Sequence, residues 1–285
     1  MSLQALRGAA LGLIAFLLPA SGLGEGEEPT RCGAVITQHL TLTRHLTCSR
    51  NGLTVTRDGV VVDLGGKTIR GPGLGAWTWP EPQLSSIGIR VTAKGVVVRN
   101  GRVENFGTAI FLDGVRGARL EGVQADQSFY GIYLKDSHGT VVAGSTVREN
   151  VYGLHIAQSH DNRVEENTIS RSYYRSPGGY GVFMVQSTGN LIRRNRIVGN
   201  ANQGLWLVDC RDNRIYHNTI AGNSPNALDD TGVGLWYSPE LKQGNFWDDY
   251  RGQDADGDGI GDTPYRLSGS GEDPYPRMRP DGWQR

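Results

Sequence analysis

Hydrophobic and polar positions alternate in short segments along the middle of the chain, and these segments recur at a nearly fixed interval. Six of them share an apolar–outer–apolar pattern and begin 21, 22, 22, 28 and 23 residues apart, at 89–91, 110–112, 132–134, 154–156, 182–184 and 205–207. Two further apolar series keep step with them: Val98, Leu120, Val142, Val164, Ile192 and Ile215, and Val103, Ala125, Val147, Ile169, Ile197 and Ile220. Three short strands per period predict a solenoid.

The segments predict an all-β fold, because each holds only three to five residues and Gly or Asn separates it from the next. One coil cannot bury its inward face alone, so the coils must stack at a strand spacing of about 4.8 Å. We therefore expect a single-stranded parallel β-helix with three sheets and roughly ten coils at most. A leucine-rich repeat has a similar period, but it needs one strand and a Leu/Asn consensus that this chain lacks.

Asparagine recurs at two equivalent turn positions of successive coils. One column holds Asn162, Asn190 and Asn213, and the other holds Asn167, Asn195 and Asn218. Stacked amides can form a hydrogen-bonded ladder, whereas the alternative is that each Asn only tolerates a left-handed turn. Both interpretations concern folding, and neither implies chemistry.

A row of outward-facing side chains is the first candidate for a binding surface. In each segment of the first series, the middle residue points away from the apolar pair beside it. Down the stack this position reads Arg90, Phe111, Tyr133, His155, Phe183 and Trp206, with Trp236 as a candidate seventh member. Three insertions each lie just before a strand position of this series, at 71–86, 171–180 and 223–232. We expect them to wall a groove over the row.

Aromatic rings with polar neighbours suit the apolar face of a sugar ring. This predicts ligand binding by Phe111, Tyr133, His155, Phe183, Trp206 and Trp236. The alternative is that the rings only pack on one another or lie under the C-terminal tail. The expected partner is therefore a polysaccharide or a periplasmic protein, and we expect the chain to be a monomer.

Acidic and basic side chains near the row are the candidates for catalysis. The next outward position contributes Asp113 and Lys135, and Asp229 and Asp230 are adjacent in sequence. Hydrolysis needs two carboxylates facing one bond, whereas a lyase or an epimerase needs a base such as His155 beside an acidic sugar. These groups form no catalytic motif. We expect a non-catalytic protein, with a polysaccharide lyase, epimerase or hydrolase as the alternative.

An acidic loop near the end of the chain follows the spacing of a calcium-binding loop. Positions one, three, five, seven and nine are Asp254, Asp256, Asp258, the Ile260 carbonyl and Asp262. Position twelve departs from the pattern, because Tyr265 stands where a glutamate belongs; Asp249, Glu272 and Asp273 are the candidate replacements. The spacing predicts a structural calcium ion that pins the Pro-rich tail over the last coil. The alternative is a solvated Asp/Gly turn without a metal.

Charge and cysteine content limit which cellular compartments and which partners fit this chain. The chain carries 29 basic and 29 acidic residues, so it lacks the basic surface that nucleic-acid binding needs. Residues 1–24 read as a secretory signal, and no later stretch is apolar enough to span a membrane. In an oxidising compartment we expect a disulfide between Cys32 and Cys48. Cys210 is expected to be a small core residue.

The ending of the chain resembles that of a known family. Gly244-Asn245-Phe246-Trp247-Asp248-Asp249-Tyr250, running into 254–265, is similar to the ending of NosD-type periplasmic β-helix proteins. The opening at 32–48 and 60–69 is similar to the first coils of many exported right-handed β-helix proteins. The repeats are shared with pectate lyases, polygalacturonases and mannuronan epimerases, which form the pectate-lyase-like superfamily.

The resemblance implies a right-handed helix, export, and an accessory role in copper-site maturation beside an ABC transporter. Copper is implied by this resemblance alone, since the chain has 3 Met and 3 Cys, whereas copper(I) favours clustered soft ligands. The expected organisation is a signal at 1–24, a β-helix at 25–243, and an acidic loop with a Pro-rich tail at 244–285. We expect a binding or accessory protein that presents an aromatic groove.

Overall fold

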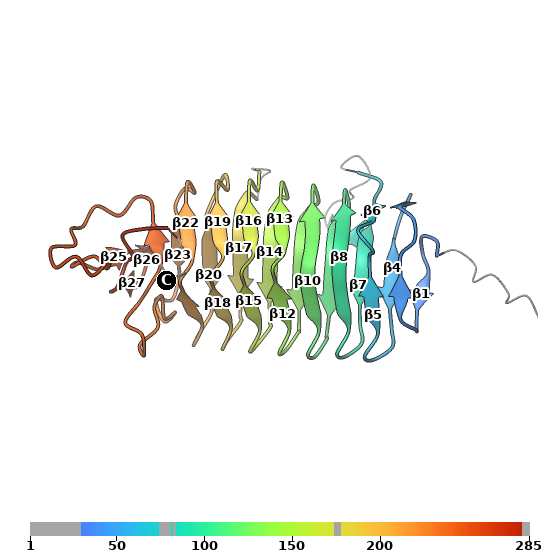
Figure 1. Cartoon of the computed structure of the whole chain (residues 1–285), viewed down its shortest axis with the longest axis horizontal. Coiled ribbons are helices and arrows are strands. Elements are labelled where there is room, and N and C mark those ends of the chain that lie inside the picture. Colours follow the sequence, from blue (N-terminus) through green and yellow to red (C-terminus); the bar gives the residue numbers. More distant parts are fainter. Residues whose placement is uncertain (1–29, 74–80, 82–83, 174–177, 281–285) are drawn as a thin grey trace, which may run out of the picture.

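The computed structural model describes residues 30–73, 81, 84–173 and 178–280. The expected signal at 1–24 lies outside the described residues, as do parts of the first two insertions. The described chain is an elongated stack of coils, with the C-terminal segment at one end (Figure 1). Within the described residues, no helix is long and apolar enough to cross a membrane.

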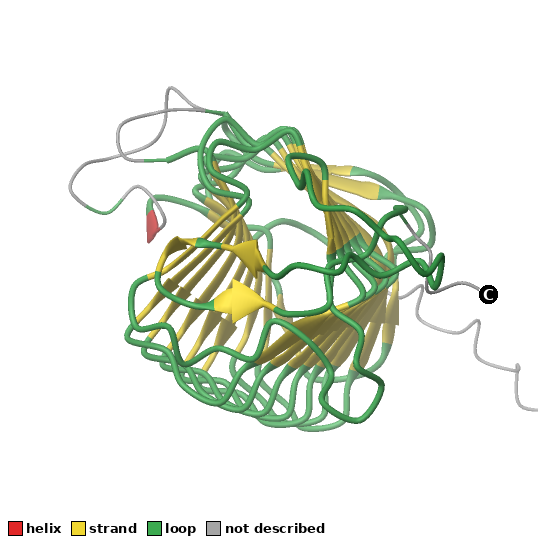
Figure 2. Cartoon of the chain, turned by 90° about the vertical axis from the view of Figure 1, so that its left-hand side faces the viewer, coloured by secondary structure: helices red, strands yellow, loops and turns green. Residues whose placement is uncertain are grey.

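One long parallel sheet, here called the first sheet, takes one strand from each coil and carries the first apolar series. In spatial order its strands are β1 (Val35–Ile36), β4 (Leu53–Val55), β7 (Ile87–Val91), β9 (Thr108–Asp113), β11 (Tyr130–Lys135), β14 (Tyr152–Ala157), β17 (Tyr180–Val185), β20 (Leu205–Val208), β23 (Ala227–Asp229) and β26 (Ser268–Gly269). Each strand pairs with that of the next coil, because the chain between them travels once around the solenoid (Figure 2).

The other two strand series line the remaining sides of the coil. The second series is β2 (Leu40–Thr41), β5 (Val61–Asp63), β12 (Val141–Ala143), β15 (Arg163–Glu165), β18 (Leu191–Arg193) and β21 (Arg214–Tyr216). The third is β3 (Leu46–Thr47), β6 (Thr68–Arg70), β13 (Thr146–Arg148), β16 (Thr168–Ser170), β19 (Arg196–Val198), β22 (Thr219–Ala221) and β24 (Phe246–Trp247). Two longer strands, β8 (Val97–Glu104) and β10 (Arg119–Asp126), run through both series and join them into one sheet.

The pairing register agrees with the predicted period. Ile110 pairs with Ile132 in the first sheet, and Leu120 pairs with Val142 in the second series. These four side chains are at most 1% exposed. The apolar series therefore build one continuous core, and the fold is a right-handed parallel β-helix, as predicted.

Both asparagine columns form hydrogen-bonded ladders. Asn162 Nδ2 donates to Asn190 Oδ1 at 2.9 Å, and Asn195 Nδ2 donates to Asn218 Oδ1 at 3.0 Å. Asn195 also donates to the Val164 carbonyl at 2.8 Å, so each amide ties its coil to neighbours on both sides. The left-handed residue is the one before each of these asparagines, such as Arg194 at a φ of 57°. The ladder interpretation is therefore the one that holds.

The two ends of the stack are fastened differently. The expected disulfide joins Cys32 to Cys48 at the first coil, with Cα atoms 5.6 Å apart. At the other end, β24 pairs with β22 and β26 pairs with β23, so the C-terminal segment adds strands to the solenoid. An antiparallel hairpin of β25 (Tyr265–Arg266) and β27 (Glu272–Asp273) flanks β26 in the sequence. Figure 1 shows this segment extending the long axis of the stack.

Candidate functional site

The predicted outward row forms a stack of side chains on the first sheet. Register pairs join Arg90 to Phe111, Phe111 to Tyr133, Tyr133 to His155, His155 to Phe183 and Phe183 to Trp206. Ring centroids of successive aromatic members lie 4.9, 4.6, 5.0 and 4.9 Å apart from Phe111 to Trp206. The row therefore presents stacked rings from neighbouring coils, as the period predicted.

Trp236 does not continue the row, and this part of the prediction was wrong. Trp206 pairs with Leu228 in β23, which takes the next position. Trp236 is fully buried at the C-terminal end of the core, where its Nε1 donates to Asp229 Oδ2 at 3.2 Å. The apolar triplet around Trp236 resembled a repeat, but the strand of that coil lies earlier in the chain.

A second aromatic column, missed by the sequence reasoning, runs beside the row. Tyr130, Tyr152 and Tyr180 open β11, β14 and β17, and Tyr130 lies 5.0 Å from Tyr133 between ring centroids. A glycine follows each tyrosine, and a Cβ on Gly131 would meet the core side chain of Val147 at 2.6 Å. The glycine therefore faces inward together with the next apolar residue, which leaves the tyrosine on the outer side.

These two columns define the aromatic face of the protein. Its members are Phe111, Tyr130, Tyr133, Tyr152, His155, Tyr180, Phe183 and Trp206. Four of them are buried by their neighbours, with exposed fractions of 3% for Phe111 and 7% each for Tyr152, His155 and Tyr180. The other four are partly exposed. The face therefore combines ring-on-ring packing with a partly exposed apolar surface.

His155 is a buried, neutral imidazole at the centre of this face. Its ring stacks on Tyr133 at 4.6 Å with an interplanar angle of 8°, and Tyr130 and Phe183 lie 4.9 and 5.0 Å away. Burial lowers the pKa of His155 to about 3, because these neighbours cannot solvate a positive charge. Among the described residues, neither ring nitrogen has a hydrogen-bond partner. Such a ring is a poor base, yet it offers one donor and one acceptor.

The charged candidates beside the row are engaged with one another. Arg90 pairs with Asp113 at 2.5 Å, and its guanidinium carbon lies 5.7 Å from the Phe111 ring centroid. Lys135 Nζ lies 3.8 Å from Asp136. Lys135 stands opposite Asp113 and Ala157 in the sheet, so it is diagonal to His155 rather than facing it. The structure does not bring these groups together as an acid–base pair.

Asp229 and Asp230 do not face one bond, because they are consecutive residues at a strand end and point to different places. Asp229 is fully buried and accepts the backbone N–H groups of Thr231 and Gly232 at 3.1 and 2.8 Å. Asp230 is exposed, and its Oδ2 accepts a hydrogen bond from Trp206 Nε1 at 3.2 Å. Asp229 therefore organises a turn, whereas Asp230 borders the last ring of the face.

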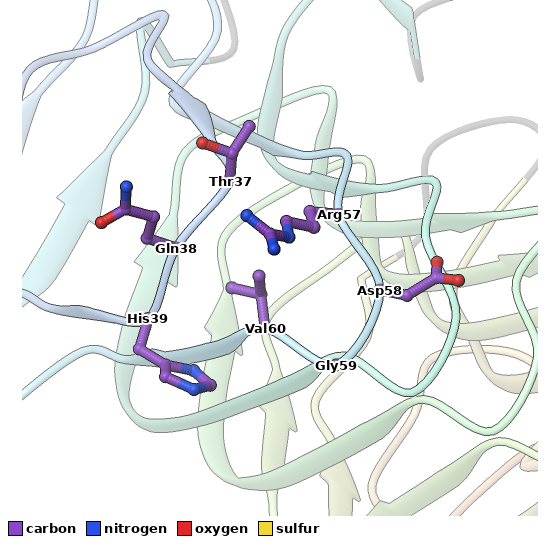
Figure 3. A pocket seen from close by; sticks show the side chains of 7 residues that line it. All are labelled: Thr37, Gln38, His39, Arg57, Asp58, Gly59 and Val60. Atoms are coloured by element: carbon purple, nitrogen blue, oxygen red, sulfur yellow. The ribbon is translucent and has the colours of Figure 1, made fainter.

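A polar hollow adjoins the second aromatic column. It has a volume of about 410 Å³ and is lined by Asn105, Gln127, Glu149 and Tyr173. Tyr173 also packs against the aromatic cluster of Phe129, Tyr152 and Tyr180. A second hollow of about 440 Å³ lies at the N-terminal end, between Thr37–His39 and Arg57–Val60 (Figure 3). It includes none of the aromatic-face residues.

The acidic loop gathers three of its predicted ligands. Asp254, Asp256 and Asp258 offer carboxylate oxygens that all lie within 4.8 Å of one another. Asp262 is outside this group, and its Oδ2 accepts the Ala255 N–H at 2.9 Å. A hollow of about 140 Å³ beside the loop also contacts Arg277, whose positive charge offsets part of the acidity.

The proposed replacements for position twelve are placed elsewhere. Asp273 is fully buried and accepts hydrogen bonds from Asn245 N at 2.7 Å and Trp247 Nε1 at 3.0 Å. Asp249 accepts from Asn226 Nδ2 at 2.8 Å. Glu272 lies in the hairpin and, like Asp249 and Asp273, is not part of the group formed by Asp254, Asp256 and Asp258.

The stacked coils define the class: a right-handed parallel β-helix protein. Over residues 51–252 the sequence matches the family described as periplasmic copper-binding protein (NosD). The match covers more than half of the chain, so the chain belongs to the NosD family. No curated protein matches the sequence.

A solved structure confirms the fold. The periplasmic alginate epimerase AlgG (D317A mutant) has a TM-score of 0.56 and 16% identity, over 74% of this chain and 55% of that one. The chain thus spans about half the length of that epimerase. Endopolygalacturonase I from Stereum purpureum has a TM-score of 0.47 and 16% identity, over 68% of this chain and 66% of that one. At such identities the likeness concerns the fold alone.

The donor atoms described in this chain do not fit a copper centre. His39, His45 and His160 each accept a backbone N–H at Nδ1, from Val61, Thr68 and Thr188, so the ring proton sits on Nε2. Cys32 and Cys48 are bonded together, while burial raises the pKa of Cys210 to about 11. Met184 is fully buried in the core. Within the described residues, the one group of three or more His, Cys, Asp or Glu side chains with converging donor atoms is the acidic loop's. His138 and His160 stack only as a pair, with ring centroids 5.1 Å apart.

Proposed function

We propose that this protein is an exported binding or accessory protein, and that its aromatic face binds a carbohydrate. The observation that carries the proposal is the stack of rings at coil spacing on one outer face, with Tyr133, Phe183 and Trp206 partly exposed. Partly exposed rings in a row suit the apolar faces of successive sugars in a chain. The adjoining hollow with Asn105, Gln127 and Glu149 adds donors and acceptors for sugar hydroxyls.

A binding role is better supported than catalysis. A general base should have a pKa near the working pH, whereas burial lowers that of His155 to about 3. A retaining or inverting hydrolase needs two carboxyl groups about 5 to 9.5 Å apart around one bond, whereas Asp229 is fully enclosed by its own turn. The polysaccharide lyase, epimerase or hydrolase function remains the alternative, and product release tests it.

A glycan-array screen of the purified protein tests the proposal. Trp206→Ala and Phe183→Ala should each lower affinity roughly tenfold for any glycan bound, because each deletes one stacking ring. Tyr216→Ala, which removes an aromatic ring from β21 on another face, is the matched control and should bind normally. Thermal melting checks that all variants are folded. A folded protein with no glycan signal and no product release would contradict the proposal and favour a periplasmic protein partner.

We also propose that calcium binds the acidic loop and plays a structural role. The support is the convergence of the Asp254, Asp256 and Asp258 oxygens within 4.8 Å, since such oxygens repel one another without a cation. The loop is joined to the tail by hydrogen bonds from Gly261 N to the Pro276 carbonyl and from Met278 N to the Gly259 carbonyl. A bound ion would therefore hold the tail against the last coil.

Chelation should lower the melting temperature by a few degrees, on the order of 1 kcal/mol of stability. Asp256→Ala should abolish this response, because it removes the central carboxylate of the three. Glu121→Gln, which changes an acidic residue on another face, should leave the response intact. An unchanged melt of the parent protein on chelation would remove the calcium proposal.

A further inference from the structure

We infer that the glycan bound by the aromatic face is uncharged, and that His155 contributes to the face as a neutral, enclosed ring. This inference rests on the proposed carbohydrate binding and names the class of ligand. Three features of the face carry it: the pairing of the cations around the rings, the carboxylate beside Trp206, and the enclosed position of His155.

The cations beside the face are already neutralised. Arg90 is held by Asp113 at 2.5 Å, and Lys135 lies 3.8 Å from Asp136. Arg171, at the corner beside Tyr173, is held by Glu149 at 2.9 Å. Recognition of a uronate carboxylate needs an arginine or lysine that is free to pair with it. Among the described residues bordering the rings, the cations are committed to carboxylates.

A carboxylate borders the Trp206 end of the face. Asp230 is exposed, and its Oδ2 accepts a hydrogen bond from Trp206 Nε1 at 3.2 Å. Trp206 is a partly exposed ring, so a sugar stacked on it lies beside this carboxylate. Like charges repel, so Asp230 discriminates against an acidic sugar.

His155 adds a ring to the face without adding a charge. It is only 7% exposed between Tyr133 and Phe183, and both of its ring nitrogens are enclosed. An enclosed imidazole stays neutral, because the surrounding rings cannot solvate a positive charge. The centre of the face therefore offers no cation to an acidic sugar.

Isothermal titration with charged and uncharged oligosaccharides tests the inference. Neutral probes are glucan, mannan and galactan hexasaccharides, and acidic probes are mannuronate and galacturonate hexasaccharides. We expect at least one neutral probe to bind roughly tenfold or more tightly than either acidic probe. Its affinity should change less than about twofold between low salt and about 0.3 M salt, because no ion pair contributes.

Two sets of variants separate the contributions. Asp230→Asn should raise the affinity for the acidic probes and leave the neutral probe unchanged, because the amide oxygen introduced at position 230 can still accept from Trp206. His155→Phe keeps an uncharged ring in the stack, so it should melt normally at neutral pH and preserve the preference for the neutral over the acidic probes. His138→Phe, at a corner outside the face, is the matched control and should bind like the parent.

The outcomes distinguish this inference from the proposed function. Tighter binding of an acidic probe, with an affinity that falls as salt rises, would overturn the inference while carbohydrate binding stands. A preference for neutral probes that disappears in His155→Phe would overturn the role given to His155. If no probe of either class binds the folded protein, the inference and the proposed carbohydrate binding are both wrong.

Discussion

Two outer faces of this solenoid use the same stacking in opposite ways. On the aromatic face, rings stack on rings: Tyr133 stacks on His155, and Phe183 contacts His155 from the next coil. On the face formed by β12, β15 and β18, charges alternate instead. Glu165 lies between Arg163 at 2.5 Å and Arg193 at 2.6 Å, one from its own coil and one from the next.

The difference shows which face of the repeat does more than pack equivalent side chains of successive coils against one another. Each outward side chain lies about 4.8 Å from the equivalent side chain of the next coil. Alternating charges and stacked rings are both favourable at this distance. The charged face satisfies its groups internally. The aromatic face leaves four rings partly exposed and His155 without a hydrogen-bond partner among the described residues. The partly exposed rings leave apolar surface open to a ligand, and this makes the aromatic face the candidate site.

Acid should affect the aromatic face most. The folded state keeps His155 neutral down to about pH 3, whereas the unfolded chain protonates it near pH 6.5. The contribution of neutral His155 to the free energy of unfolding is therefore full above pH 6.5, and it decreases as the pH falls below 6.5. Between about pH 6.5 and about pH 4.5 the loss should be about 2–3 kcal/mol. Urea unfolding at several pH values measures it.

His155→Phe should remove this part of the pH dependence, since phenylalanine stacks but does not titrate. The difference between parent and variant cancels the titration of carboxylates elsewhere, so the comparison isolates one imidazole. His138→Phe should follow the parent. Parallel curves for the parent and His155→Phe would mean that the imidazole is solvated in solution, which contradicts its place inside the face.

The asparagine ladder holds both faces in register, so breaking it should weaken both. Asn195→Ala removes the bonds to Val164 and Asn218 and leaves Asn167 with fewer partners. We expect a loss of about 2 kcal/mol in the free energy of unfolding. Asn202→Ala, which removes one side-chain bond of 3.4 Å near Gly178, should cost much less. Equal losses in these two variants would argue against a ladder that sets the register.

Much of the fold could be predicted because a period is a one-dimensional signal. Ile110 and Ile132 lie one period apart in the sequence, and this spacing predicts that they pair, because equivalent positions of successive coils lie side by side. The same argument placed Phe183 beside Trp206 and the asparagines in columns. The disulfide followed from compartment and position rather than from the period.

The depth and width of the site could not be predicted from the period. Strict alternation would turn Tyr130 and Tyr133 to opposite sides, but the inward-facing Gly131 breaks the alternation and places both outside. The recurring Tyr-Gly pair at the start of three strands was the available signal. Burial of His155 depends on this second column, so its lowered pKa was also hidden. Trp236 was misplaced because the last coil departs from the repeat spacing.

The smallest expected effect lies on the charged face. Glu165→Gln removes the carboxylate between Arg163 and Arg193, which have side chains 52% and 25% exposed. Exposed pairs contribute little, so the loss should be under about 1 kcal/mol and should shrink further in about 0.5 M salt. Phe183→Leu on the aromatic face should show a loss that salt does not reduce. Unfolding curves of both variants at low and high salt make the test, and a large, salt-independent loss for Glu165→Gln would show that the charged face is buried by something other than its own arginines.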